Sequence, residues 1–271
     1  MLKDILARFP AEFRSMTYLE VFGGGASVLF NKPPSQKEIL NDYNGDLIHF
    51  YRCVRECPEL LIDRLLFVLN SREDWKLAVK RLQRQEYDDP LQRAADFYHV
   101  LCFSYGGGGR SFGLTPRPMW SRFPLIMEAC GRLQGVVIEN MDFEKVIRAN
   151  DSPQTFLYCD PPYFETEDYY SGFTPSDHER LQSLLLNAQG KWLLSYNDCP
   201  EIIELYQKPG LYIERVERIN NLMQRYESGA RYSELLISNY ETSQLLPEQL
   251  SLDQLLDVAE ETQQERNFIW Q

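Results

Sequence analysis

The sequence predicts an α/β fold, in which helices cover a sheet, with a helical insertion. Seven short runs of strand composition recur along the first 240 residues, and several are continuous apolar runs rich in β-branched or aromatic residues. Such runs are typical of strands that are buried on both faces. Helical patterns lie between many of these runs, and this alternation favours an α/β sheet.

The first helix is expected over residues 1–10, where Leu2, Ile5, Leu6 and Phe9 have the spacing of one packed helix face. The strands that follow are expected at residues 17–22, 37–42, 136–142, 155–163, 192–198, 212–220 and 233–240.

Two further helices are expected between these strands, over residues 46–57 and 176–188. The second of them begins with Ser176 and has Glu179 three residues later, which is the pattern of a capping box.

The strand–helix alternation stops between the second and third strands. Three helices are expected there instead, over residues 58–70, 72–86 and 91–104, followed by a stretch rich in glycine and proline. We therefore expect an inserted, mainly helical domain over residues 58–135, which divides the sheet domain into residues 1–57 and 136–240. Residues 241–271 form an acidic, amphipathic tail that we expect to be partly helical.

Length and composition describe a globular protein large enough to have its own core. The chain has 271 residues, of which 44% are hydrophobic and 25% charged, and this excludes general disorder. No apolar run is long enough to span a bilayer and no signal segment opens the chain, so we expect a soluble, cytoplasmic protein. The six cysteines form no disulfide framework and the three histidines are not grouped, so no metal site is expected.

The net charge of −12 disfavours simple bulk attraction to nucleic acid, but the charge is unevenly distributed. Residues 50–135 contain thirteen Lys or Arg and ten acids, a net +3, whereas residues 241–271 carry a net −6. Within the middle block, residues 97–127 contain no acid and seven aromatic residues. This local reversal of charge is compatible with contact to a polyanion.

Residues 20–27 (EVFGGGAS), at the end of the first expected strand, are a candidate ligand-binding turn. Consecutive glycines let the backbone turn sharply and approach a ligand at the carboxyl edge of a sheet. Asp42 ends the second expected strand, where an acid can accept hydrogen bonds from ribose hydroxyls. A tight turn with a helix-capping Asp has the same pattern, and these two features alone do not separate the two interpretations.

Asp160, Pro161, Pro162 and Tyr163 follow a buried strand and form the most specific motif in the chain. Two successive prolines fix φ and leave carbonyl groups outside the ladder. The Asp160 carboxylate and the Pro161 carbonyl can then both accept from one exocyclic NH₂ group, and Tyr163 offers a π face for a planar base. A capped proline turn is the plainer alternative.

Residues 105–113 (YGGGGRSFG) are either a flexible linker or a loop that contacts DNA. We favour contact, because flexible linkers rarely lie in an acid-free stretch dense in aromatic residues. The candidate DNA-binding residues are Tyr105, Arg110, Ser111, Arg117 and Arg122.

In this order the motifs resemble those of the Dam-like DNA adenine-N6 methyltransferases, the alpha group. The resemblance covers residues 1–240 and includes Asn41 before Asp42, and residues 139–143 (ENMDF), 194–197 (LSYN) and 234–239 (ELLISN). It implies a Rossmann-like, seven-stranded methyltransferase sheet, with residues 58–135 as the target-recognition domain.

The same resemblance implies that S-adenosylmethionine is the cofactor and that duplex DNA is the partner. The residues implied to bind the cofactor are Phe22, Gly23, Gly24, Gly25, Asp42, Asp142, Phe143 and Asp160. The residues implied to be catalytic are Asp160, Pro161, Pro162 and Tyr163. The methyl group would go to N6 of an adenine flipped out of the duplex, without a covalent enzyme intermediate.

The sequence departs from the family at its start. The family normally has an aromatic-containing G-G-K segment before its first helix, and here Met1 to Leu6 resembles that helix itself. We therefore expect weak cofactor binding, and a truncated homologue that only binds DNA is the alternative function. Enzymes that methylate an amide nitrogen or an RNA base have a related tetrad, but usually with Asn first and without so large an insertion.

Overall fold

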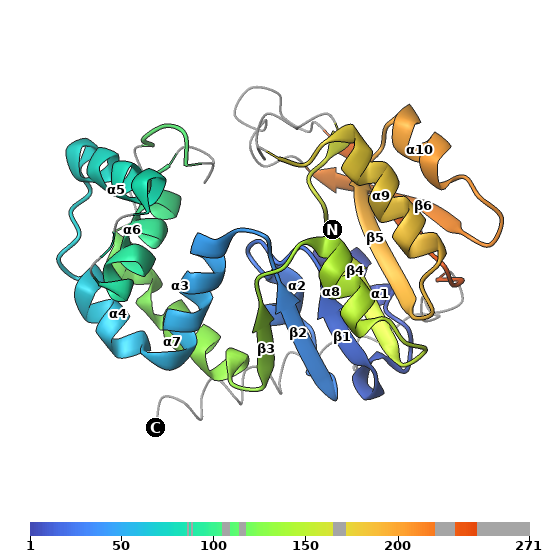
Figure 1. The fold of residues 1–271 in the computed structure, drawn as a ribbon, viewed down its shortest axis with the longest axis horizontal. Helices are drawn as coiled ribbons and strands as arrows, with labels where there is room; N and C mark the ends of the chain where they lie inside the picture. The colour runs from blue at the N-terminus through green and yellow to red at the C-terminus, as the bar shows by residue number, and fades with distance from the viewer. Residues whose placement is uncertain are drawn as a thin grey trace.

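A seven-stranded sheet forms the centre of the protein, in the order β3-β2-β1-β4-β5-β7-β6 (Figure 1). The computed structural model describes residues 1–85, 87, 89–104, 109–113, 118–164, 172–219 and 231–242. The strands are β1 (Thr17–Glu20), β2 (Lys37–Asn41), β3 (Val136–Glu139), β4 (Thr155–Cys159), β5 (Lys191–Asn197), β6 (Tyr212–Ile219) and β7 (Arg231–Ser238). The first five run parallel to one another, whereas β7 is antiparallel to both β5 and β6. The expected α/β class and its Rossmann-like, methyltransferase-type sheet are confirmed.

All seven strands expected from the sequence are present, but several end earlier than expected. The fourth was expected over residues 155–163 and ends at Cys159. Pro161 and Pro162 follow, and a proline has no N–H with which to continue a ladder inside a sheet. The Asp160–Tyr163 tetrad therefore lies in a loop at the carboxyl edge of the sheet.

The helices fill the connections between the strands. They are α1 (Leu2–Ala7), α2 (Ser27–Asn31), α3 (Gly45–Glu56), α4 (Pro58–Leu65), α5 (Arg72–Arg84), α6 (Pro90–Phe103), α7 (Phe123–Leu133), α8 (Phe143–Asn150), α9 (Pro175–Leu186) and α10 (Pro200–Tyr206), with 3-10 turns η1 (Phe13–Ser15) and η3 (Met119–Arg122).

The capping box of α9 differs from the one expected. Its N-cap is Thr174, and Asp177 rather than Glu179 closes the box by accepting from the Thr174 N–H at 2.8 Å. The helix begins at Pro175, whose fixed φ and missing N–H suit the first helical position. The box is therefore shifted by two residues from Ser176.

Helices cover both faces of the sheet, and alternate residues of each central strand pack into different cores. Tyr18 of β1 joins the core formed with α1, α2 and α3, and the next residue, Leu19, joins the core formed with α8, α9 and α10. Both side chains are fully buried. This arrangement explains the continuous apolar runs, because neither face of these strands meets water.

Helices α4 to α7, here called the helical block, lie beside the β3 edge of the sheet (Figure 1). The helix before them packs into the same core: Phe50 of α3 stacks on Tyr98 of α6, with ring centroids 5.1 Å apart and an angle of 6° between the planes. Packing is therefore continuous across the boundary drawn at residue 58.

Candidate active site

The carboxyl ends of β1, β2 and β4 meet at one place on the edge of the sheet. β1 lies between the other two, with Glu20 paired to Leu40 on one side and to Tyr158 on the other. The strand order reverses direction between β1 and β4, and such a switch point is where open α/β sheets bind ligands. The segments after these three strands are the glycine-rich turn, Asp42 and the Asp160 tetrad.

The turn after β1 requires glycine at Gly23. A Cβ atom there would lie 2.8 Å from Leu40 Cδ1 and 2.9 Å from the Asn41 carbonyl oxygen. Gly24 has a φ of +48°, and both Gly24 and Gly25 have open space where a side chain would stand. The turn therefore packs closely on β2 on one side and leaves bare backbone on the other, as close approach of a ligand requires.

Asp42 joins this turn to the start of α3. Its Oδ2 accepts from the Gly24 N–H at 2.8 Å, and its Oδ1 accepts from the Asn44 N–H at 2.7 Å. Each carboxylate oxygen has further acceptor capacity for a hydroxyl of a ligand. Burial raises the pKa of Asp42, although hydrogen bonds from the backbone oppose the shift.

Three phenylalanine rings cluster beside the turn. Phe22 lies 5.7 Å from Phe143 and 5.8 Å from Phe173, and these last two rings lie 5.6 Å apart. The Arg180 guanidinium covers Phe143 at 4.3 Å and donates to Asp142 Oδ2 at 2.8 Å. The structure therefore brings Phe22 and Phe143 together, as expected, and holds the Asp142 carboxylate at the N-cap of α8.

Asp160 is exposed at the end of β4, and Ser195 of β5 holds its carboxylate. The Ser195 Oγ–H donates to Asp160 Oδ1 at 2.8 Å. Because this proton goes to Asp160, the Tyr158 hydroxyl, 3.1 Å from Ser195 Oγ, is placed to donate to the serine. Ser195 is buried, and it lies in the 194–197 segment whose likeness to the family gave it no particular role.

Tyr163 is also fixed from a distant strand. Its hydroxyl donates to Glu234 Oε2 of β7 at 3.3 Å, and its ring lies 6.2 Å from that of Tyr196. Glu234 is buried, with only 4% of its surface exposed. Sequence reasoning identified the tetrad but missed Ser195 and Glu234, which come from strands far along the chain.

Glu20 is a buried carboxyl group directly under this edge. It accepts from the Tyr18 hydroxyl at 2.7 Å, and burial, with a further contribution from the Asp160 charge, raises its pKa to about 8. At neutral pH Glu20 is therefore mainly uncharged, and the site keeps the negative charge of Asp160 without a second carboxylate beneath it.

We expect the Glu20→Gln variant to lose a pH dependence of stability that the parent chain has. Folding raises the pKa of Glu20 from about 4.5 to about 8. The protonated carboxyl group therefore stabilises the folded chain fully at a pH below 4.5, the pKa in the unfolded chain, and this stabilisation is lost as the pH rises towards 8. The slope is at most about 1.4 kcal/mol per pH unit. Urea unfolding of both chains across this range measures it, and parallel curves for the two chains would contradict the assignment.

The expected DNA-contact residues fall in different environments. Arg110 and Ser111 are exposed in the short segment 109–113, whereas Tyr105 and Arg117 lie outside the described residues. Arg122 is half-buried and points its guanidinium at Cys102 Sγ, 3.1 Å away, inside the helical block.

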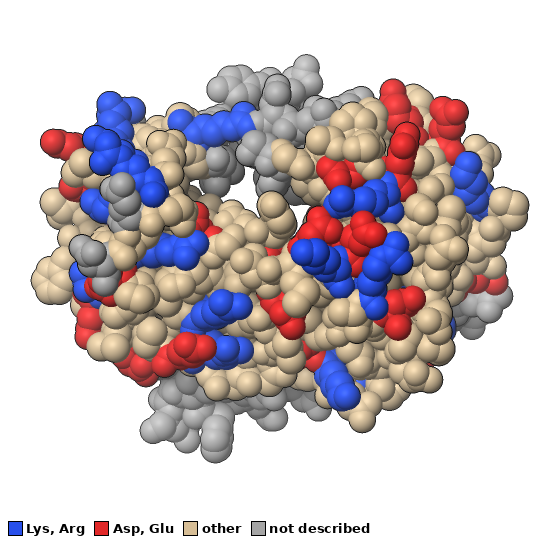
Figure 2. All heavy atoms as spheres, in the orientation of Figure 1, with Lys and Arg blue, Asp and Glu red and all other residues tan. Residues whose placement is uncertain are grey.

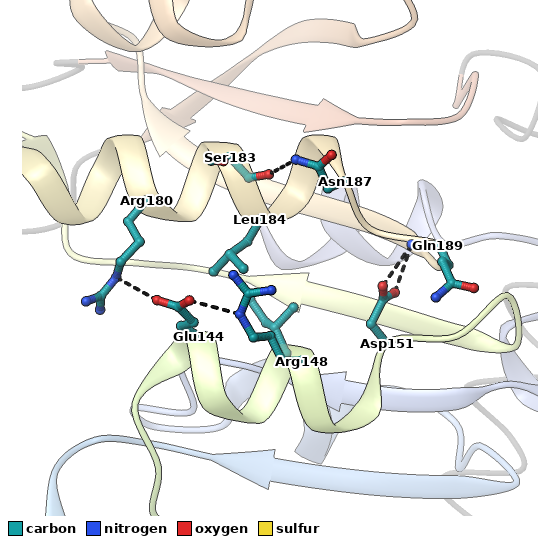
Figure 3. A pocket seen from close by; sticks show the side chains of 9 residues that line it. Glu144, Arg148, Asp151, Arg180, Ser183, Leu184, Asn187 and Gln189 are labelled. Carbon is teal, nitrogen blue, oxygen red and sulfur yellow. Dashed lines mark hydrogen bonds and ion pairs between the residues drawn. The ribbon is translucent and has the colours of Figure 1, made fainter.

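A separate groove of about 480 Å³ lies between α8 and α9 (Figure 3). Its charged groups bind one another: Glu144 pairs with Arg148 at 2.9 Å and with Arg180 at 3.5 Å. Asp151 accepts from the N–H groups of Gln189 and Gly190. The charged groups that line the groove therefore bind one another or the backbone, and the Glu144–Arg180 pair joins α8 to α9.

The described residues contain neither a helix suited to cross a membrane nor a cluster suited to hold a metal ion. No helix among them is long and apolar enough to cross a membrane. Within the same ranges, no group of three or more His, Cys, Asp and Glu side chains is placed to hold a metal ion.

The sheet order, the glycine turn with Asp42 and the Asp160 tetrad define the class of the protein as an α/β methyltransferase. The family model for D12 class N6 adenine-specific DNA methyltransferases matches residues 1–105 and 124–224. The chain belongs to this family, and its activity is site-specific methylation of adenine N6 in DNA.

The curated relatives agree with this assignment. The Type II methyltransferase M1.LlaDCHI of Lactococcus lactis subsp. cremoris is 29% identical over 82% of this chain and 86% of its own length. The DNA N-6-adenine-methyltransferase of Escherichia phage P1 is 34% identical over 72% of this chain, which spans only 28% of that longer protein. The DNA adenine methylase of Escherichia coli (strain K12) is 26% identical over 80% of this chain and 84% of its own length. Among solved structures, the match to the rRNA methyltransferase aviRa from Streptomyces viridochromogenes covers 90% of this chain and 84% of that chain, with a TM-score of 0.37 and 12% identity.

Proposed function

We propose that the protein transfers a methyl group from S-adenosylmethionine to N6 of an adenine that is rotated out of duplex DNA. The observation that carries this proposal is the meeting of the Gly23 turn, Asp42 and the Asp160 tetrad at one edge of the sheet. A donor bound on the turn and a base bound on the tetrad would then be neighbours. Because the substrate is DNA, we also propose that the protein acts in the cytoplasm.

The residues present fit such a cofactor. The bare backbone at Gly24 and Gly25 offers room for a close-lying ligand, and the Asp42 carboxylate offers acceptors for ribose hydroxyls. Phe22 and Phe143 offer an aromatic surface for a nucleobase. Gly23 shapes the turn, and Asp142 and Asp160 border the same site. When bound, the cofactor supplies an electrophilic methyl group on a sulfonium.

Asp160 and Pro161 would act on the amine of adenine. The N6 lone pair is delocalised into the ring, so this amine is a poor nucleophile. If the Asp160 carboxylate and the Pro161 carbonyl accept hydrogen bonds from the two N–H groups of this amine, the nitrogen would gain sp³ character. Its lone pair would then be directed at the methyl carbon. The methyl group that N6 gains would come from the bound cofactor, and the surplus proton of N6 would leave through Asp160 to solvent. Positioning and preorganised acceptors are the main contributions of the protein.

Tyr163 and the helical block would handle the DNA. An enzyme cannot reach N6 inside a duplex, so the target must be rotated out, and the Tyr163 ring would stack on it. We propose residues 58–135 as the target-recognition domain, in which Arg110 and Ser111 contact the duplex. Tyr105, Arg117 and Arg122 stay predicted contacts.

The proposal is tested by offering methyl-labelled S-adenosylmethionine together with duplex DNA, single-stranded DNA or RNA of the same sequence. We expect label in duplex DNA above both other polymers. Equal or greater labelling of RNA would overturn the proposed substrate, and calorimetry without nucleic acid would show independently whether the donor binds.

Ser195 should prove to be a positioning residue for Asp160. Ser195→Ala removes a hydrogen bond to a carboxylate, which contributes about 1.5–3 kcal/mol, so we expect kcat to fall roughly 10- to 100-fold with little change in the KM for DNA. Ser195→Thr keeps the hydroxyl and should recover most of the rate.

Ser238→Ala is the matched control for this variant. Ser238 is equally buried on β7, where it pairs with Leu193 of β5, and its hydroxyl donates to the Tyr240 carbonyl rather than to a residue of the candidate site. Equal losses of kcat in the Ser195 and Ser238 alanine variants would mean that Ser195 acts through stability alone.

A further inference from the structure

Helix α5 carries a row of four cations that lies outside the residues already assigned to DNA. Arg72, Lys76, Lys80 and Arg84 follow one another at intervals of four residues, so they lie along one face of the helix. With a rise of about 1.5 Å per residue, the row is roughly 18 Å long. We call these four residues the α5 stripe.

The α5 stripe faces solvent because the other side of the helix is packed. Trp75 and Ala78 are buried, and Arg81 forms a bidentate pair with the buried Asp96 of α6, at 2.6 and 2.7 Å. All four members of the stripe are exposed, and within the described parts of the chain none of them has an ion pair.

The exposed face that carries the stripe has four cations and one acid, Glu73, which lies in the first turn three residues before Lys76. Like charges four residues apart destabilise a helix by about 0.2–0.5 kcal/mol for each pair, and the stripe contains three such pairs. On α8, by contrast, Arg148 pairs with Glu144 at the same spacing. A bound polyanion would turn the repulsion along α5 into attraction.

Both ends of the α5 stripe reach segments that belong to the proposed site. At one end, the Arg72 guanidinium lies 4.8 Å from the ring of Phe112, in the segment that carries Arg110. At the other end, Gln85 donates to the Asp46 carboxylate at 3.2 Å. Asp46 lies in the first turn of α3, four residues after Asp42. The stripe therefore runs between the segment 109–113 and the edge where the base would be methylated.

The surface over α5 is rich in cations. Lys and Arg side chains gather there, at the upper left of Figure 2. Duplex DNA carries one negative charge per about 1.7 Å of its axis, so a row of this length can face several phosphates. The stripe itself supplies only cations at a regular spacing, which suits contact with backbone phosphates.

We propose that the α5 stripe binds backbone phosphates of the duplex beside the target adenine. The proposal rests on the proposed function and extends it: Arg110 and Ser111 lie in a loop, whereas the stripe is a rigid element that sets how the duplex lies over the edge. The stripe lies outside the acid-free stretch of residues 97–127, and its signal in the sequence is the spacing of its cations.

The test compares two double variants with the same change in charge. Lys76→Gln with Lys80→Gln removes the middle of the stripe. Lys37→Gln with Lys208→Gln removes two exposed lysines elsewhere, one of them at the start of β2 on the opposite edge of the sheet. The affinity for a duplex containing adenine targets is measured across a range of salt concentrations, and methyl transfer is measured separately at saturating DNA.

We expect the log–log salt slope of the stripe variant to fall by about 1.8, which is two phosphate contacts, and that of the control variant to match the parent. The KM for DNA should rise in the stripe variant while kcat at saturating DNA stays within about twofold of the parent. A parental slope in the stripe variant, or equal loss in both variants, would overturn the proposal. The two proposals can fail separately. If the parent chain transfers no methyl group but the stripe variant still has a smaller log–log salt slope for DNA binding, the proposed function is wrong and the proposed phosphate contact is supported.

Discussion

Replacing Asp160 with alanine is expected to abolish methyl transfer, with a loss of at least about 100-fold in kcat, while the chain stays folded. Asp160 is exposed at the end of β4, where its carboxylate would accept from the reacting amine. A preorganised acceptor contributes mainly in the transition state, so the KM for DNA should change far less than kcat.

The measurement is single-turnover transfer of label to DNA, with urea unfolding of each variant to show that the fold is retained. Asp160→Asn keeps the shape and removes the charge, and it should lose a similar factor. Asp63→Ala is the control, since Asp63 is an exposed carboxylate on α4, away from this edge. Near-parental turnover in both Asp160 variants would show that the tetrad is not catalytic.

Replacing Asp42 with alanine should weaken the binding of S-adenosylmethionine by roughly 10- to 100-fold, the effect of losing a charged hydrogen-bond acceptor. The variant loses acceptors for the ligand and also the contacts from the Gly24 and Asn44 N–H groups that shape the turn. Isothermal calorimetry on the chain without DNA measures this affinity directly.

Asp151→Ala is the matched control for Asp42. Its carboxylate also accepts from two backbone N–H groups, those of Gln189 and Gly190, but at the start of β5 rather than at the carboxyl edge. Burial raises the pKa of Asp42. As the pH is lowered, the affinity of the parent chain for the cofactor should therefore begin to fall at a higher pH than it would with an aspartate of ordinary pKa. Equal affinities of the Asp42 variant and the parent would remove Asp42 from the cofactor site.

The sequence identified those parts of the fold and site that depend on neighbours along the chain. Apolar runs located all seven strands, and the two prolines after Asp160 marked a break in the ladder. Three consecutive glycines predicted the turn after β1. The close contacts at Gly23 explain why a glycine is needed there. Each of these signals is local in sequence.

The remaining parts depend on contacts between distant segments, which a single sequence does not encode in a visible pattern. Ser195 reaches Asp160 only because β5 lies beside β4, and Glu234 reaches Tyr163 only because β7 inserts between β5 and β6. The raised pKa of Glu20 arises from burial at the centre of the sheet. The α5 stripe is an exception, since its spacing of four residues is visible in the sequence.

The central claim is that adenine N6 accepts the methyl group at the Asp160 edge. It is tested most directly by digesting DNA to nucleosides after reaction with isotopically labelled S-adenosylmethionine and identifying the labelled base by mass spectrometry. The account predicts labelled N6-methyladenine from the parent chain and at least about 100-fold less from Asp160→Asn. Label on a cytosine, or equal amounts of N6-methyladenine from both chains, would contradict it.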